Sequence, residues 1–296
     1  LSGVAGWPAL AVAGAAQLAL LGTLIALLWP ALRTPAGQRH HAFGWALAGM
    51  ALLVAGFYLD ALRGAYPMRW LHAFLGLLMV LIVIAMSRIS MRIVNRAIDQ
   101  AGTGAEPYLA RPPRRNLAVL CIALFTLAEF VHEGSATSGW LACASAAALF
   151  NLLGDWHVGR PLLRRWPLML YTVYLCMALG YGLMGWALLA SGPGVTAGRH
   201  LLTVGAMGLA IYAVICIAGR AHCGLAIDER AWGVWGAGLI ALAALLRAGA
   251  AWAGDSSVAW MVLAGLCWVA AFGLLCVFIG PVLWRVREDG LWGCEG

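Results

Sequence analysis

The chain has 296 residues, of which 63% are hydrophobic and only 10% are charged. Soluble domains are about half apolar and a quarter charged, so this composition excludes a water-soluble globular protein. The formal net charge of +7 comes from arginines without any lysine, and they stand in short stretches between apolar runs. That distribution favours the membrane lipid surface as their partner and argues against nucleic-acid binding.

Apolar runs of about 20 residues, the length that crosses a bilayer as a helix, follow one another along the chain. We predict an all-α fold, a polytopic transmembrane helical bundle forming a single domain over residues 1–296. Pro167 suits the first turn of the sixth helix, where its missing N–H would be unpaired anyway. The nine predicted spans are residues 5–30, 42–62, 71–94, 116–132, 137–153, 167–191, 200–219, 231–253 and 258–284.

The arginines predict the orientation of these helices. With nine spans, fifteen arginines fall on one side of the membrane and four on the other. Under the positive-inside rule the richer side is cytoplasmic, so we expect the N-terminus outside and the C-terminus in the cytoplasm. The outer side receives Arg63, Arg69, Arg199 and Arg247.

Three histidines lie near the predicted outer face: His72 begins the third span, His132 ends the fourth and His200 begins the seventh. Two imidazoles facing each other from different helices are the usual way to hold a haem, and Arg247 and Arg199 are at the level needed to neutralise its propionates. The alternative is interfacial histidines bonded to water or lipid headgroups. His222 lies about 33 Å from His200 along a straight helix, so these two cannot bind one metal.

Glu129, His132 and Glu133 are spaced three and four residues apart at the end of the fourth span, which predicts a shared helix face. Glu-x-x-His occurs in carboxylate metal sites, but those sites need the motif twice and two further carboxylates. Glu129 is therefore a candidate metal ligand. A cap at the outer interface or a proton-handling pair is the alternative.

Arg88, Arg92 and Arg96 recur every four residues at the inner end of the third span. Snorkelling of these side chains to lipid phosphates explains such a basic stripe. The alternative is a structural or ligand-binding role for Arg88, which lies deepest.

Several kinds of site have no support in the sequence. The eight cysteines stand singly without Cys-x-x-Cys spacing, so neither a disulfide framework nor a zinc ribbon is expected. There is no phosphate-binding glycine loop, nucleophile elbow or His-Glu-x-x-His helix. The closely spaced histidines of a haem-copper oxidase are missing too. The residues alone therefore do not support a catalytic redox enzyme.

One motif resembles that of a known family. Residues His200–Gly208 read His-Leu-Leu-Thr-Val-Gly-Ala-Met-Gly, and His222–Gly224 read His-Cys-Gly. Both resemble the signature of the NnrS family of bacterial membrane proteins, in residue types and in separation. Three weaker matches keep the family order, and the first of them resembles a turn that ends the third span: Ser87–Ile89, Arg111–Arg115 and Arg287–Gly290.

The resemblance implies a multi-pass protein of the bacterial inner membrane that binds haem and copper and acts in the response or tolerance to nitric oxide. It makes His200 and His222 candidate cofactor and metal ligands, and Arg88 a motif residue. The chain departs from the family at Ile217, where an arginine is expected, and at Tyr171, where a histidine is expected. The family's N-terminal His-x-His-Glu motif is not found, so we expect the chain to lack those helices.

Two other classes of function stay open. A transporter or channel for a small metabolite would show interrupted helices and ion pairs at membrane depth, and Arg247 is the solitary deep arginine that fits. The other class is a membrane assembly factor without a ligand, in which His200 and His222 could be replaced without consequence.

Overall fold

The structure is a computed structural model that describes residues 6–34, 41–102, 106–287 and 290. Of these described residues 85% are helical, and none lies in a strand. Eight helices are long and apolar enough to cross a membrane. The predicted all-α fold is confirmed, and the chain is a multi-pass membrane protein.

Each of the nine predicted segments is helical. The first five are α1 (Gly6–Leu32), α2 (His41–Leu62), α3 (Met68–Ala101), α4 (Pro112–Val131) and α5 (Ala136–Leu153). After two short 3-10 turns, η2 (Gly154–Trp156) and η3 (Arg160–Leu163), α6 covers Arg165–Ala190. A continuous helical stretch Gly194–His222 follows, then α10 (Trp232–Gly249), two further turns η6 (Ala250–Trp252) and η7 (Gly254–Ser256), and α11 (Ser257–Leu283).

Two helices differ from the prediction. Arg114, Arg115 and Glu129 all lie within α4, and this charge keeps α4 out of the eight candidate spans. The third helix was expected to end near residue 94 with a turn after Arg88, and this expectation is wrong because α3 continues to Ala101. Met91, three residues after Arg88, has the backbone N–H that a proline would lack, so the helix can continue through it.

The chain forms two compact units. Unit 1 comprises residues 1–81 and 122–138, and contains α1, α2 and parts of α3 and α4. Glycine lets its helices approach closely: a Cβ on Gly56 would lie 2.5 Å from the Trp70 ring. Asp60, near the end of α2, accepts hydrogen bonds from Arg69 (2.9 Å) and Trp70 (2.7 Å), which ties α2 to the start of α3.

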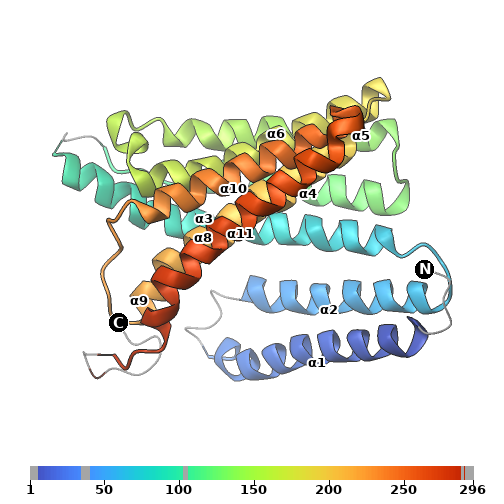
Figure 1. Cartoon of the computed structure of the whole chain (residues 1–296), viewed down its shortest axis with the longest axis horizontal. Coiled ribbons are helices and arrows are strands. Elements are labelled where there is room, and N and C mark those ends of the chain that lie inside the picture. The colour runs from blue at the N-terminus through green and yellow to red at the C-terminus, as the bar shows by residue number, and fades with distance from the viewer. Residues whose placement is uncertain (1–5, 35–40, 103–105, 288–289, 291–296) are drawn as a thin grey trace. The chain divides into compact units, whose positions relative to one another are not determined.

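Unit 2 comprises residues 82–121 and 139–296. Its centre is formed by α6 and the stretch Gly194–His222, the most buried of the candidate spans. These helices cross at two glycines, because a Cβ on Gly198 would lie 2.5 Å from the carbonyl oxygen of Gly180. Small residues at helix crossings are typical of membrane bundles. Figure 1 shows α10 and α11 running side by side, and these two helices pack along much of their length.

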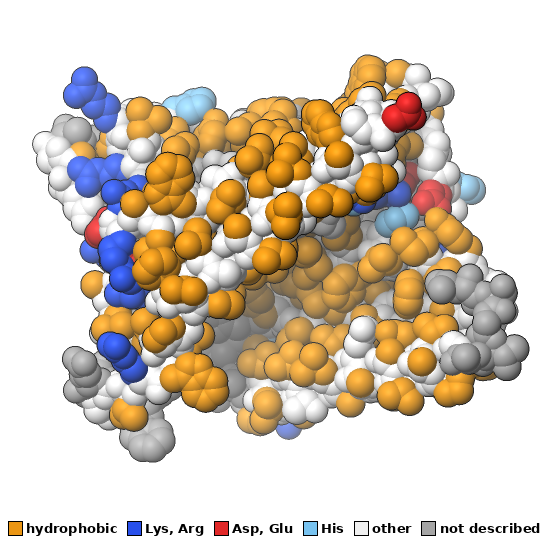
Figure 2. All heavy atoms as spheres, viewed as in Figure 1, with side chains coloured by type: hydrophobic (Ala, Val, Ile, Leu, Met, Phe, Trp, Pro, Cys, Tyr) orange, Lys and Arg blue, Asp and Glu red, His pale blue; other side chains and the backbone are white. Residues whose placement is uncertain are grey.

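The helices of unit 2 have two chemically different ends. We call the end with Ser191, Gly194, Gly249 and Ser257 the histidine end, since His200 lies there. We call the other end, with Ala101, Pro112, Arg165 and His222, the arginine end. Arginine side chains gather near α9 (Arg220–His222) in the face shown in Figure 2.

Candidate functional site

The stretch that carries the family-like motif is not a uniform α-helix. It is built from α7 (Gly194–His200), a π-helical segment η4 (Leu201–Met207), α8 (Gly208–Val214), a second π-helical segment η5 (Ile215–Gly219) and α9. Single π-helical turns inside α-helices occur frequently at functional sites. The first of them begins directly after His200, so the structure singles out the same place as the motif.

His200 faces α10 through a small apolar cluster. Ala197 and Leu201, on either side of His200, pack with Ala244 and Ala248 of α10. Arg247, in the last turn of α10, lies close enough to His200 for the charge of its guanidinium to affect the imidazole. Both His200 and Arg247 are half-buried, and neither has a hydrogen bond or ion pair with another described residue.

The glycines of the motif have a packing role. A Cβ on Gly205 would lie 3.0 Å from Cys176 Sγ of α6 and 3.2 Å from Ala244. One on Gly208 would lie 2.6 Å from the Trp268 ring of α11. The motif therefore lets η4 and α8 fit between three neighbouring helices, which explains Gly-x-x-Gly in physical terms.

His222 lies at the arginine end of the same continuous helix. Its side chain is exposed, its neighbour Cys223 is half-buried, and its carbonyl oxygen accepts a hydrogen bond from Arg287 (3.1 Å). An α-helix of this length separates the two histidines by about 33 Å. The structure thus does not bring His200 and His222 together.

The remaining predicted site residues on α3 and α4 occupy different surroundings. In unit 1, His72 Nδ1 lies 3.3 Å from Glu133 Oε1. Glu129 is buried and accepts a hydrogen bond from the N–H of Gly134 (3.0 Å), whose φ of 77° closes the turn after α4. His132 is exposed. In unit 2, Arg88 is exposed on α3.

The expected shared helix face of Glu129, His132 and Glu133 is corrected by this geometry. The helix ends at Val131, so His132 and Glu133 belong to the following turn. Glu129 acts there as a cap within the turn, which is one of the two alternatives left by the sequence. Within the described ranges, no group of three or more His, Cys, Asp or Glu side chains is placed to hold a metal ion.

Carboxylates organise the arginine end. Asp155 pairs with Arg114 (2.7 Å) and Arg111 (3.5 Å), so the basic loop resembling the family's has a structural role in joining α4 to η2.

An amide contact fixes the loop that follows α3. Asn95 of α3 holds the backbone of Tyr108 through hydrogen bonds of 2.6 and 3.1 Å. Burial raises the pKa of Tyr108 to about 12.

A second carboxylate, Asp228, holds the loop before α10. It pairs with Arg230 (2.6 Å) and Arg220 (3.6 Å), and accepts a hydrogen bond from the Trp232 indole (3.1 Å). The hydrogen bonds from Arg230 keep the pKa of the Asp228 carboxyl well below its usual value of 3.8. The sequence analysis did not predict this network, whose residues Asp228, Arg230 and Trp232 stand close together in the chain.

Comparison with known proteins supports the family resemblance of the motif and extends it to nearly the whole chain. The NnrS protein family model matches residues 1–287, including the first helices, where no motif was found. No curated protein and no solved structure matches the chain. Of the weaker motifs, the closing one includes Glu288 and Asp289, which lie outside the described residues. Because the family model covers nearly the whole sequence, the chain belongs to the NnrS family.

Proposed function

We propose that this protein binds haem at the histidine end of unit 2 and acts in the response to nitric oxide at the bacterial inner membrane. His200 would hold the haem iron and Arg247 would bind a haem propionate. Membership of the NnrS family supports the general function, since haem and copper are associated with that family. The observation that carries the assignment of residues is the unpaired state of both side chains.

The donor chemistry of this pair fits a haem. Polar and charged groups inside a membrane bundle are costly, and they normally pair with one another or bind a ligand. His200 offers an imidazole nitrogen, the usual proximal ligand of haem iron. Arg247, on the helix packed against it, offers a guanidinium that lacks an anion within the described part of the chain. Haem would supply an iron atom able to bind nitric oxide, while these residues would orient it.

Copper fits the described residues less well. Imidazole and thiolate are ligands that copper takes, and His222 with the adjacent Cys223 offers one of each. This pair lies at the arginine end, so copper bound there would be a site separate from the haem.

The test is a reduced-minus-oxidised absorbance spectrum of the purified full chain expressed with sufficient haem. Wild type is compared with His200→Ala and with the matched control His222→Ala, at the other end of the same helix. We expect a haem band in wild type and in His222→Ala, and none in His200→Ala. Absence of the band from all three proteins, or its survival in His200→Ala, would contradict the proposal.

A metabolite transporter remains the second candidate. The observation in its favour is the pair of π-helical segments in the central helix, although the helix stays continuous. Substrate uptake into liposomes that does not change with haem content would select this function. A phenotype unchanged by replacing both His200 and His222 would instead select an assembly factor.

A further inference from the structure

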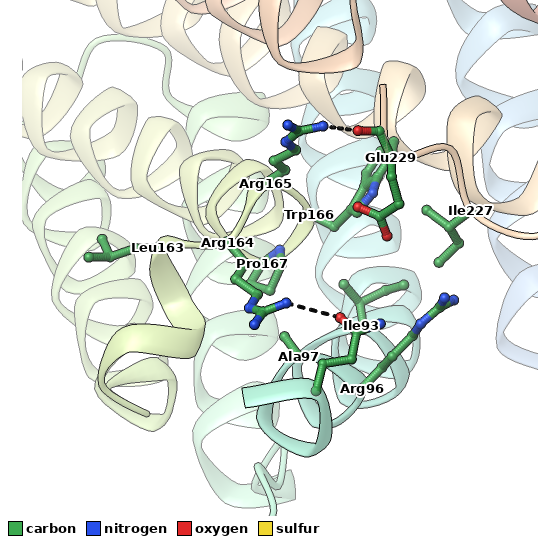
Figure 3. A pocket seen from close by; sticks show the side chains of 11 residues that line it. Ile93, Arg96, Ala97, Leu163, Arg164, Arg165, Trp166, Pro167, Ile227 and Glu229 are labelled. Atoms are coloured by element: carbon green, nitrogen blue, oxygen red, sulfur yellow. Dashed lines mark hydrogen bonds between the residues drawn. The ribbon is translucent and has the colours of Figure 1, made fainter. Parts of the chain in front are cut away.

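A cavity of about 460 Å³ opens at the arginine end of unit 2. It lies where the last turns of α3 meet the start of α6 and the loop before α10 (Figure 3). This volume is in the range of pockets that hold small organic ligands. Nothing in the haem proposal uses it, because it lies at the opposite end from His200.

The cavity is lined by more positive than negative charge. Arg96, Arg164 and Arg165 contribute three guanidinium groups, and Glu229 contributes the one carboxylate. Arg164 donates one hydrogen bond to Gln100 (3.2 Å), and Arg165 donates one to the backbone carbonyl of Glu229. Each guanidinium has five N–H donors, so most of them are left for a ligand. Arg96 has no hydrogen bond or ion pair within the described residues.

The start of α6 adds further donors at the same place. No side chain caps this helix, and its first free backbone N–H groups belong to Arg165 and Trp166. A helix N-terminus carries a partial positive charge that attracts anions. Figure 3 shows Arg164, Arg165 and Trp166 lining the cavity from this helix start.

The side chain of Trp166 forms part of the cavity wall. Its indole is only 8% exposed, and its Nε1 lies out of reach of a water molecule, so this atom does not face the open space of the cavity. The ring therefore contributes apolar surface to the wall, and the arginines supply the hydrogen-bond donors.

We infer that this cavity is a binding site for a phosphate group, held by Arg96 of α3 and by Arg164 and Arg165 at the start of α6. Guanidinium groups bind phosphate oxygens in a bidentate manner, which makes arginine the preferred residue for this anion. Ile93, Ala97 and Leu163 give the cavity an apolar wall. An anionic phospholipid headgroup and free inorganic phosphate share the recognised chemistry, and the experiment distinguishes them.

The experiment measures the melting temperature of the delipidated full chain in detergent during titration with three probes. These are phosphatidylglycerol, zwitterionic phosphatidylcholine and inorganic phosphate. We expect Arg164→Gln with Arg165→Gln to weaken binding of the effective probe at least about tenfold. Glu229→Gln removes the one carboxylate of the lining and should strengthen binding of the same probe.

Arg160→Gln is the matched control. It removes the same charge from the same basic segment, but Arg160 does not line the cavity. A response to phosphatidylglycerol that exceeds phosphatidylcholine and is lost in the double variant, but kept in the control, supports a lipid headgroup. The same pattern with inorganic phosphate supports a soluble phosphate. No response to either probe, or equal loss in Arg160→Gln, overturns the inference; unliganded melting temperatures show whether each variant is folded.

Discussion

The two ends of unit 2 differ in whether their charged groups have ion-pair partners. At the arginine end, Asp155 and Asp228 neutralise several arginines through ion pairs as short as 2.7 and 2.6 Å. At the histidine end, His200 and Arg247 are half-buried on packed helices and have no such partner within the described ranges. The charges paired with Asp155 and Asp228 join loops to helices, so their presence needs no ligand. Ligands are expected only where charged groups lack such a carboxylate, which are His200 with Arg247 at one end and the arginines of the cavity at the other.

The largest expected effect tests the packing that holds His200 in place. Gly198→Leu should destabilise the protein by about 3 kcal/mol or more, because the new side chain must enter a space where even a Cβ meets the Gly180 carbonyl oxygen at 2.5 Å. The measurement is the melting temperature in detergent, together with haem content. Gly238→Leu is the control, since nothing lies within 4 Å of a Cβ there. Equal effects of the two substitutions would contradict the close crossing of α6 and α7.

The next effect concerns the arginine end. Asp228→Asn should cost about 1 to 2 kcal/mol at neutral pH, because hydrogen bonds to a charged carboxylate are lost while Arg230 remains partly solvated. Since the folded-state pKa of Asp228 lies below the usual 3.8, its contribution is full above that pH and is lost as the pH falls further. Melting temperatures of wild type and variant should therefore converge below about pH 4. Exposed Asp255→Asn, the control, should show no such difference.

A smaller effect is expected at the histidine end. Arg247→Gln should weaken haem binding about tenfold, equivalent to about 1.4 kcal/mol, because one charge-assisted hydrogen bond to a propionate is lost. Titration of the apoprotein with haem measures the dissociation constants of wild type and variant, whose ratio is the expected change of about tenfold. Exposed Arg92→Gln on α3 serves as the control. If both variants bind haem like wild type, Arg247 is not the propionate partner.

The smallest effect contrasts a paired histidine with the unpaired one. His72→Gln should lower stability by no more than about 1 kcal/mol, because it removes one partly exposed side-chain contact. It should leave the haem spectrum unchanged, since His72 already has Glu133 at 3.3 Å. A lost or shifted haem band in His72→Gln would make His72 a ligand and reduce the contrast between the two histidines.

The helices could be predicted from the sequence because a bilayer imposes the length of an apolar run. The predicted span 42–62 matches α2 at His41–Leu62, and Pro167 lies in the first turn of α6 as expected. The end of α3 was missed because polar residues from 95 onward resemble a loop, whereas tertiary contacts such as that of Asn95 with Tyr108 keep the helix ordered.

The candidate site was only partly accessible to sequence reasoning. His200 and Arg247 could be assigned to the same level from the predicted spans, and their helices do pack together there. The π-helical segments could not be predicted, because they depend on how η4 fits against α6 and α10. The phosphate cavity combines side chains from positions 96, 164 and 229, which no local pattern connects.

The two π-helical segments also fix the rotational phase of the central helix. Each accommodates an extra residue in one turn, so residues before and after it are turned relative to a regular α-helix. Deleting Val204 would remove the extra residue, so the helix could close into a regular turn while His200 keeps its rotation relative to Tyr212. Deleting a residue from the regular α-helical segment Gly208–Val214 would instead turn His200 by about 100° relative to the residues that follow. The protein should therefore tolerate the loss of one residue from Leu201–Met207 better than the loss of one residue from Gly208–Val214.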